Sequence, residues 1–130
     1  NSIAPNIIKM DVHGSEGLIL KGATNTLANS VDYILLEVHQ QQLLDLFSDG
    51  IKKIEILDEL NKRGFKNYLI SPFRYNKKNY DFKQYKINNK LNYIEVNKSN
   101  FHQVLFDRNQ IDMFILSIKS SLCIDDLDCF

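Results

Sequence analysis

The sequence predicts a single α/β domain built on a mostly parallel sheet. Two apolar runs rich in β-branched residues, at 6–12 and 31–39, are each long enough for one buried strand. Between them, apolar residues from 19 to 27 recur at helical spacing. Two strands joined by a helix form a βαβ unit, and its strands are parallel. A chain of 130 residues can bury one core but not two, so we expect one domain or part of one.

The first helix is expected to begin near Ser15 and Glu16. Serine is a favoured capping residue, and a carboxylate in the first turn interacts well with the helix dipole. Gly17 and Gly22 each weaken an exposed helix by about 1 kcal/mol relative to alanine. We therefore expect these glycines to allow the close approach of a neighbouring backbone or ligand.

The later elements follow from periodicity and from turn residues. Residues 40–47 predict a short helix and residues 48–50 a turn, and the apolar spacing from Ile51 to Leu60 predicts an amphipathic helix that Gly64 ends. Strands are expected at 65–70, 91–96 and 101–106, with a turn at 107–109 and a loop or ragged hairpin insertion at 73–90. Apolar positions from 111 to 122 predict a helix, with a strand at 112–118 as the alternative, because short apolar runs fit both.

Charge and cysteine content narrow the range of partners. Sixteen basic and sixteen acidic side chains cancel, so the whole chain has no field that attracts nucleic acid or anionic lipid. The apolar runs are far shorter than the ~20 residues of a membrane helix, and no membrane contact is expected. Cys123 and Cys129 are too few for a zinc site. Free thiols, a reducing compartment and a cytoplasmic location are the expectation.

The most informative motif lies between residues 7 and 39. Asp11 follows the first strand, and Gly14 and Glu16 lie at the start of the helix. The helix contains the segment Leu-Lys-Gly-Ala at residues 20–23, and Glu37 lies near the end of the second strand. This segment resembles the late core of the FkbM family of S-adenosylmethionine-dependent methyltransferases. The resemblance implies the C-terminal half of a Rossmann-like methyltransferase sheet, mostly parallel with an antiparallel end. His13 stands where that family has a glutamate.

The first strand end carries three candidate site residues. Ligands of open α/β sheets bind outside the carboxyl ends of the strands, so functional side chains are expected there. Asp11 is predicted to face the cofactor or the acceptor as a catalytic carboxylate, with helix capping as the alternative. Gly14 is predicted to lie beside the cofactor. His13 is the candidate general base, because imidazole exchanges a proton around neutral pH, and a solvated loop histidine is the alternative.

The second strand end adds two more candidates. Glu37 interrupts an apolar run, so its carboxylate must be paired or lie near the open end of the sheet, and it is predicted to be catalytic. His39 points to the same side if the strand continues. His39 and Glu16 are predicted to contact the substrate; the alternatives are a surface histidine and a helix-stabilising glutamate. Asp11, His13, Glu37 and His39 could gather as hard ligands, but they form no compact ligand motif, and no metal site is predicted.

The leading functional hypothesis is O-methylation of a small-molecule or carbohydrate-like acceptor with S-adenosylmethionine as cofactor, as the resemblance implies. No Gly-x-Gly turn occurs among the five glycines, so the 130 residues by themselves are expected to bind the cofactor poorly, and residues upstream of Asn1 are expected to supply that turn. One alternative is a non-catalytic interaction module. Another is nucleic-acid binding by the basic and aromatic segment 73–90, although the neutral chain makes a nucleic-acid partner the weaker hypothesis.

Overall fold

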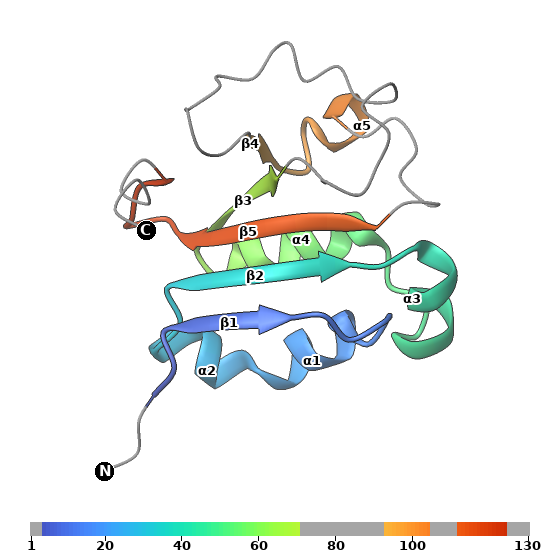
Figure 1. Ribbon diagram of the computed structural model, residues 1–130, viewed down its shortest axis with the longest axis horizontal. Helices are drawn as coiled ribbons and strands as arrows, with labels where there is room; N and C mark the ends of the chain where they lie inside the picture. Colours follow the sequence, from blue (N-terminus) through green and yellow to red (C-terminus); the bar gives the residue numbers. More distant parts are fainter. Residues whose placement is uncertain (1–3, 71–92, 105–111, 125–130) are drawn as a thin grey trace.

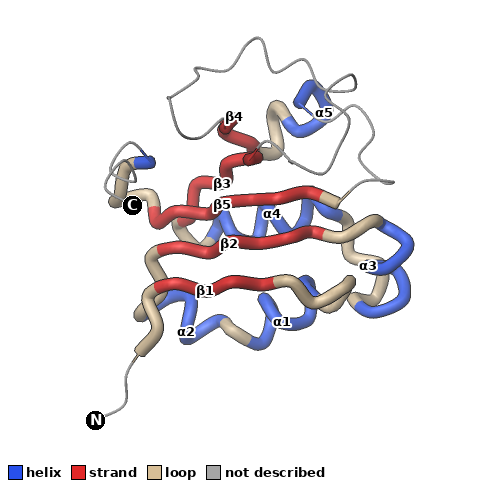
Figure 2. Tube along the Cα trace, viewed as in Figure 1, coloured by secondary structure: helices blue, strands red, loops and turns tan. Residues whose placement is uncertain are grey.

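The computed structural model describes residues 4–70, 93–104 and 112–124, which form a five-stranded sheet with helices packed against it (Figures 1 and 2). The strands are β1 (Ile7–Met10), β2 (Tyr33–Val38), β3 (Phe65–Ile70), β4 (Tyr93–Val96) and β5 (Met113–Lys119). The helices are α1 (Glu16–Gly22), α2 (Thr24–Asn29), α3 (Gln41–Phe47), α4 (Lys53–Lys62) and α5 (Phe101–Val104). Within these ranges, no helix combines the length and the apolar character needed to cross a membrane.

The strand order is β1-β2-β5-β3-β4. β1 and β2 are parallel neighbours with Met10 opposite Leu36, as the βαβ prediction requires, whereas the other three neighbouring pairs are antiparallel. The α/β class is confirmed, but the prediction of a mostly parallel sheet is wrong. The reason is that β5, the last of the described strands, lies between β2 and β3 and runs antiparallel to both (Figure 1).

The segment 113–119 is a strand and not the preferred helix. Met113, Ile115 and Ser117 are buried with period two, and the alternative strand at 112–118 is thus the correct one. An apolar run of this length fits either periodicity, and pairing with two neighbouring strands decides the matter. Only the tertiary contacts of β5 could resolve this choice.

The start of the predicted strand at 101–106 is also wrong, because residues 101–104 form helix α5. Asn97 initiates this helix: its side-chain Oδ1 accepts hydrogen bonds from the backbone N–H groups of Ser99 and Asn100, and its carbonyl accepts one from Phe101. Such local bonds from an asparagine favour a turn or a helix start over a continuing strand. The remaining expectations for 73–90 and 107–109 lie outside the described residues.

The other helix and strand positions hold with small shifts, but Ser15 makes no side-chain capping hydrogen bond at the start of α1. β3 has the predicted bounds, and β1, β2 and β4 lie inside the predicted runs. α3 and α4 occupy the expected segments, and Gly64 ends α4 with a φ of 83°, a conformation that glycine adopts without steric cost. The first helix, however, is divided at Ala23 into α1 and α2.

The two glycines of α1 differ. A Cβ atom at Gly17 would lie 2.6 Å from Ile51 Cγ2, so this glycine permits the close packing of α1 against the segment before α4. At Gly22, no atom of the described residues lies within 4 Å of the corresponding position. The expected close approach of a neighbouring backbone is therefore found at neither glycine, because the atoms that Gly17 admits belong to side chains.

The core lies between the sheet and the helices, with α4 behind the sheet in Figure 1. Along β2, Ile34, Leu36 and Val38 are fully buried, while Leu35 on the other face is exposed. Among the described residues, therefore, β2 is covered on one face only, and not on both as its apolar sequence suggested. Glu37 lies on this less covered face and is half-buried.

Candidate functional site

The candidate site lies where β1 and β2 end side by side. Because these strands are parallel and in register, the residues that follow them emerge at the same edge of the sheet. A pocket of about 330 Å³ opens there, and its lining includes Asp11, His13, Glu37, His39, Gln40 and Asp112. The structure therefore brings together the four strand-end residues that the sequence singled out.

The loop after β1 has an unusual backbone. His13 has a φ of 52° and Gly14 a φ of 104°, both in the region that favours glycine. A Cβ atom at Gly14 would lie 2.5 Å from the carbonyl oxygen of Leu43, so this loop packs directly on α3. The Gly14 carbonyl accepts a hydrogen bond from Ser48 Oγ, and its N–H donates to Glu16. Both backbone groups of Gly14 thus have partners inside the protein, which gives this residue a packing role.

Two buried side chains, Glu16 and His39, contact each other beside the pocket. Glu16 is 0% exposed and His39 is 4% exposed. His39 Nδ1 lies 2.5 Å from Glu16 Oε1, and the same oxygen accepts a hydrogen bond of 3.2 Å from the Gly14 N–H. An ionised carboxylate oxygen only accepts hydrogen bonds, so with Glu16 ionised Nδ1 donates across this contact, and Nε2 is the ring nitrogen that faces Asp11. Glu16 thereby sets the orientation of His39.

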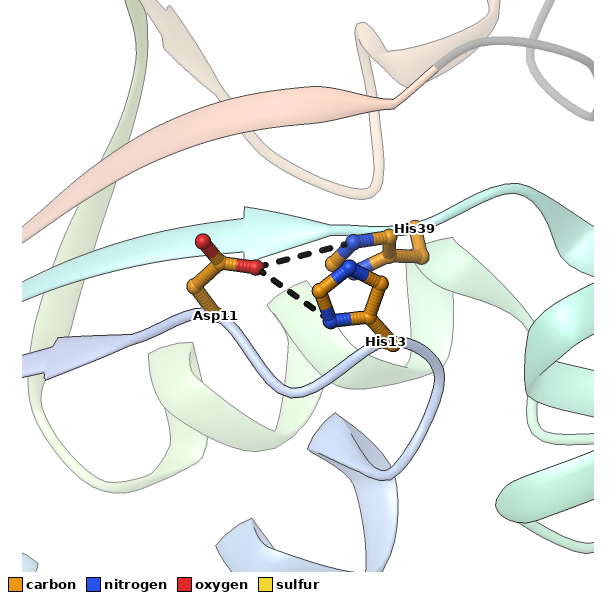
Figure 3. Close-up of side chains that lie close together, drawn as sticks. All are labelled: Asp11, His13 and His39. Atoms are coloured by element: carbon orange, nitrogen blue, oxygen red, sulfur yellow. Dashed lines mark ion pairs between the residues drawn. The ribbon is translucent and has the colours of Figure 1, made fainter.

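Asp11 faces both histidines (Figure 3). Its Oδ1 atom lies 3.7 Å from His39 Nε2 and 3.8 Å from His13 Nδ1. The two imidazole rings are stacked, with centroids 4.7 Å apart. The other carboxylate oxygen, Oδ2, lies 3.6 Å from Lys9 Nζ. His39 Nε2 and His13 Nδ1 therefore both lie within 4 Å of Asp11 Oδ1, at the edge of the sheet.

Asp112 and Gln40 are parts of the pocket that the sequence did not single out. Asp112 precedes β5, and its Oδ1 accepts a hydrogen bond of 2.9 Å from the Gln40 N–H. This bond ties the start of β5 to the segment that follows β2. Asp112 lies more than half the chain away from Asp11 in sequence, and because β5 was expected to be a helix, no sequence signal placed it here.

Glu16, predicted to contact the substrate, does not line the pocket. Its carboxylate is fully buried, and its second oxygen, Oε2, has no hydrogen-bond partner within the part of the chain that the structure describes. A buried acceptor without a partner is uncommon in native proteins. Because Glu16 contacts His39 and does not reach the pocket, it acts on the site only through the orientation of that histidine.

A larger hollow of about 590 Å³ lies between α1 and α4. Asp58, which lines it, forms ion pairs with Lys62 at 3.2 Å and with Lys98 at 3.9 Å, so its charge is already paired within the protein. No histidine lines this hollow. The smaller pocket is the candidate site because of its chemistry: a buried, oriented imidazole faces a partly exposed carboxylate.

Comparison of the chain with protein-family models, with curated proteins and with solved structures finds no match. The resemblance to the FkbM family therefore stays a prediction that rests on the motif between residues 7 and 39.

Proposed function

We propose that the protein is an S-adenosylmethionine-dependent methyltransferase that methylates a hydroxyl group of a small-molecule or carbohydrate-like acceptor. The observation that carries this proposal is the Glu16–His39 pair, which holds Nε2 of His39 3.7 Å from Asp11 Oδ1 at the carboxyl edge of a parallel strand pair. The motif between residues 7 and 39 supports methyl transfer as the reaction class. The Glu16–His39 pair supports a hydroxyl acceptor, because a hydroxyl needs a base that accepts its proton.

The residues of the pocket suit a cationic cofactor in part. Asp11, Glu37 and Asp112 line the pocket, and carboxylates attract a sulfonium. The glycine-rich turn that binds such cofactors in Rossmann-like folds does not occur in the 130 residues. S-adenosylmethionine, when bound, supplies an electrophilic methyl group.

His39 is the proposed general base. Its Nε2 would accept the proton of the acceptor hydroxyl as that oxygen attacks the methyl group which the cofactor would supply. The imidazolium that forms is stabilised by Glu16 on one side and by Asp11 on the other. We assign this role to His39 rather than to His13, because the His13 side chain is 78% exposed and, among the described residues, no buried carboxylate contacts its ring nitrogens.

Asp11 has a positioning role toward the acceptor. A second hydroxyl on the acceptor can donate a hydrogen bond to Asp11 while the reacting hydroxyl donates to His39 Nε2. Neighbouring hydroxyl groups of this kind are typical of carbohydrates. Holding the reacting oxygen in line with the methyl group contributes much of the rate in such a transfer.

One further feature supports the proposal. β5 runs antiparallel to both of its neighbours, β2 and β3, and the resemblance implied that part of the sheet is antiparallel.

The test measures transfer of a radiolabelled methyl group from S-adenosylmethionine to a panel of sugars and other polyols, using the protein as its gene encodes it. We expect His39→Gln to lower kcat by about 10²–10⁴-fold, the usual contribution of a general base, and Asp11→Asn to raise KM for the acceptor. His102→Ala, which removes an exposed histidine of α5, is the matched control and should leave both constants unchanged. Absence of transfer to every acceptor, or full activity in His39→Gln, would contradict the proposal.

A further inference from the structure

We propose that Asp11, His13 and His39 form a binding site for a divalent transition-metal ion such as Zn²⁺. One ligand atom from each of the three side chains can be chosen so that all three atoms lie within 4.8 Å of one another. They come from two adjacent strand ends, with Asp11 and His13 after β1 and His39 after β2 (Figure 3). Imidazole nitrogens and a carboxylate oxygen are a donor set that zinc and other first-row ions accept.

The distances are close to those of a bound ion. Donor atoms that each lie about 2.1 Å from one tetrahedral ion are about 3.4 Å apart. Asp11 Oδ1 lies 3.7 Å from His39 Nε2 and 3.8 Å from His13 Nδ1, so each separation must shorten by a few tenths of an ångström. His13 is the most exposed of the three side chains, so rotation of its ring can make the remaining adjustment at little cost in packing.

The contact between Glu16 and His39 Nδ1 is the second observation that points to a metal. A histidine that binds a metal through one ring nitrogen almost always donates its other ring N–H to a carboxylate, a carbonyl or water. Glu16 Oε1 provides this contact to His39 Nδ1 at 2.5 Å, in a place closed to solvent. Nε2 is therefore the ring nitrogen presented to the cluster, and it faces Asp11 Oδ1.

One contact opposes the ion. Lys9 Nζ lies 3.6 Å from Asp11 Oδ2 and would repel a cation. The side chain of Lys9 is 70% exposed and contacts the oxygen that faces away from the histidines. It can remain in water while Asp11 Oδ1 binds the ion.

Three protein ligands leave at least one coordination position open. Structural zinc sites usually have four protein ligands, whereas catalytic sites have three and keep a place for water or substrate. Here the pocket of about 330 Å³ adjoins the cluster. The ion would bind an oxygen of water or of an acceptor hydroxyl at that place and lower the pKa of that oxygen. In the metal-free protein, His39 would instead accept the proton of the hydroxyl.

The inference needs only the three side chains and does not depend on methyl transfer. It is tested by isothermal titration of Zn²⁺ into metal-free protein, without cofactor or acceptor, and by the visible absorption of Co²⁺ bound in place of zinc. We expect one ion per chain with micromolar or tighter affinity. The three histidines of the sequence are His13, His39 and His102, so the variants can separate the cluster from other sites.

His13→Ala and Asp11→Asn should each weaken zinc binding by at least about 10-fold, and Glu16→Gln by about 10- to 100-fold, as is usual when the residue behind a ligand is changed. His13→Ala alters an exposed side chain and should fold like the parent protein, which circular dichroism checks. His102→Ala should bind zinc unchanged.

The proposal is overturned if the parent protein shows neither zinc heat nor a Co²⁺ absorption band. It is equally overturned if His13→Ala and Asp11→Asn bind as tightly as the parent, or if His102→Ala removes binding. Because no methyl donor is present, failure of this test would leave the methyltransferase proposal standing, and failure of the transfer assay would leave this one standing.

Discussion

Glu16 Oε1 and His39 Nδ1 lie 2.5 Å apart and join the start of α1 to the end of β2 across 23 positions of sequence. Both side chains are buried, so the contact is protected from competing water. It gives the histidine one defined orientation in which Nε2 faces Asp11. Both proposals made above, proton transfer and metal binding, use this nitrogen.

Removing the carboxylate of Glu16 should destabilise the protein. Glu16→Ala leaves the Gly14 N–H and His39 Nδ1 without their acceptor, and each buried unsatisfied group costs about 1–3 kcal/mol. Glu16→Gln should cost less, because the amide oxygen can still accept. Urea unfolding gives the free energies, with Glu95→Ala as the control, because Glu95 is exposed on β4 and its loss should change stability by no more than about 0.5 kcal/mol. Equal values for Glu16→Ala and Glu95→Ala would contradict the structural role of the pair.

Gly14→Ala and Gly22→Ala should have effects of opposite sign. At Gly14 the φ of 104° and the 2.5 Å approach to Leu43 O exclude a Cβ atom, so the free energy of unfolding should fall by more than about 1 kcal/mol. At Gly22 no atom of the described residues lies within 4 Å, and alanine should raise stability by about 0.4–1 kcal/mol by restricting the unfolded chain. Thermal unfolding of both variants under one buffer condition checks the sign. A stabilised Gly14→Ala protein would show that the loop after β1 does not pack on α3 as described.

A buried polar cluster should couple β3 to β5. Asn67 donates to Leu57 O and to Asn61 Oδ1, and it accepts a bond of 2.7 Å from Ser117 Oγ on the neighbouring strand. Ser117→Ala removes one bond and should cost about 1–3 kcal/mol, because it leaves a buried oxygen with one partner fewer. Asn67→Ala should cost more, because it breaks all three bonds.

The double variant of Asn67 and Ser117 should be less destabilised than the sum of the single variants, since the two share a bond. Denaturant unfolding of all four proteins measures the coupling. Strict additivity would mean that the bond between the two side chains contributes nothing to stability.

The 130 residues by themselves should not bind S-adenosylmethionine measurably. They contain no Gly-x-Gly turn, and such turns let the backbone approach the ligand at the start of the first helix of the fold. Isothermal titration with the cofactor checks this, with circular dichroism to confirm that the sample is folded. A micromolar binding signal would refute the expectation and would mean that the pocket residues alone suffice for cofactor binding.

The sequence by itself determined the parallel β1-β2 pair, the amphipathic helix α4 and the strand β3. Their signals are local: continuous apolar runs, helical spacing and a terminating glycine. A parallel pair also places the residues after both strands at one edge, which is why Asp11, Glu37 and their neighbouring histidines could be expected together.

Only the tertiary structure decided the position of β5, the contact between Glu16 and His39, and the presence of Asp112 in the pocket. The apolar spacing from 111 to 122 fits a helix as well as a strand, and pairing with β2 and β3 selects the strand. The Glu16–His39 bond depends on a loop with positive φ that folds back on α3, and no periodicity encodes such a turn. Contacts of this kind join residues far apart in the chain. They stabilise the protein only after the helices and strands have packed, so a local sequence pattern does not predict them.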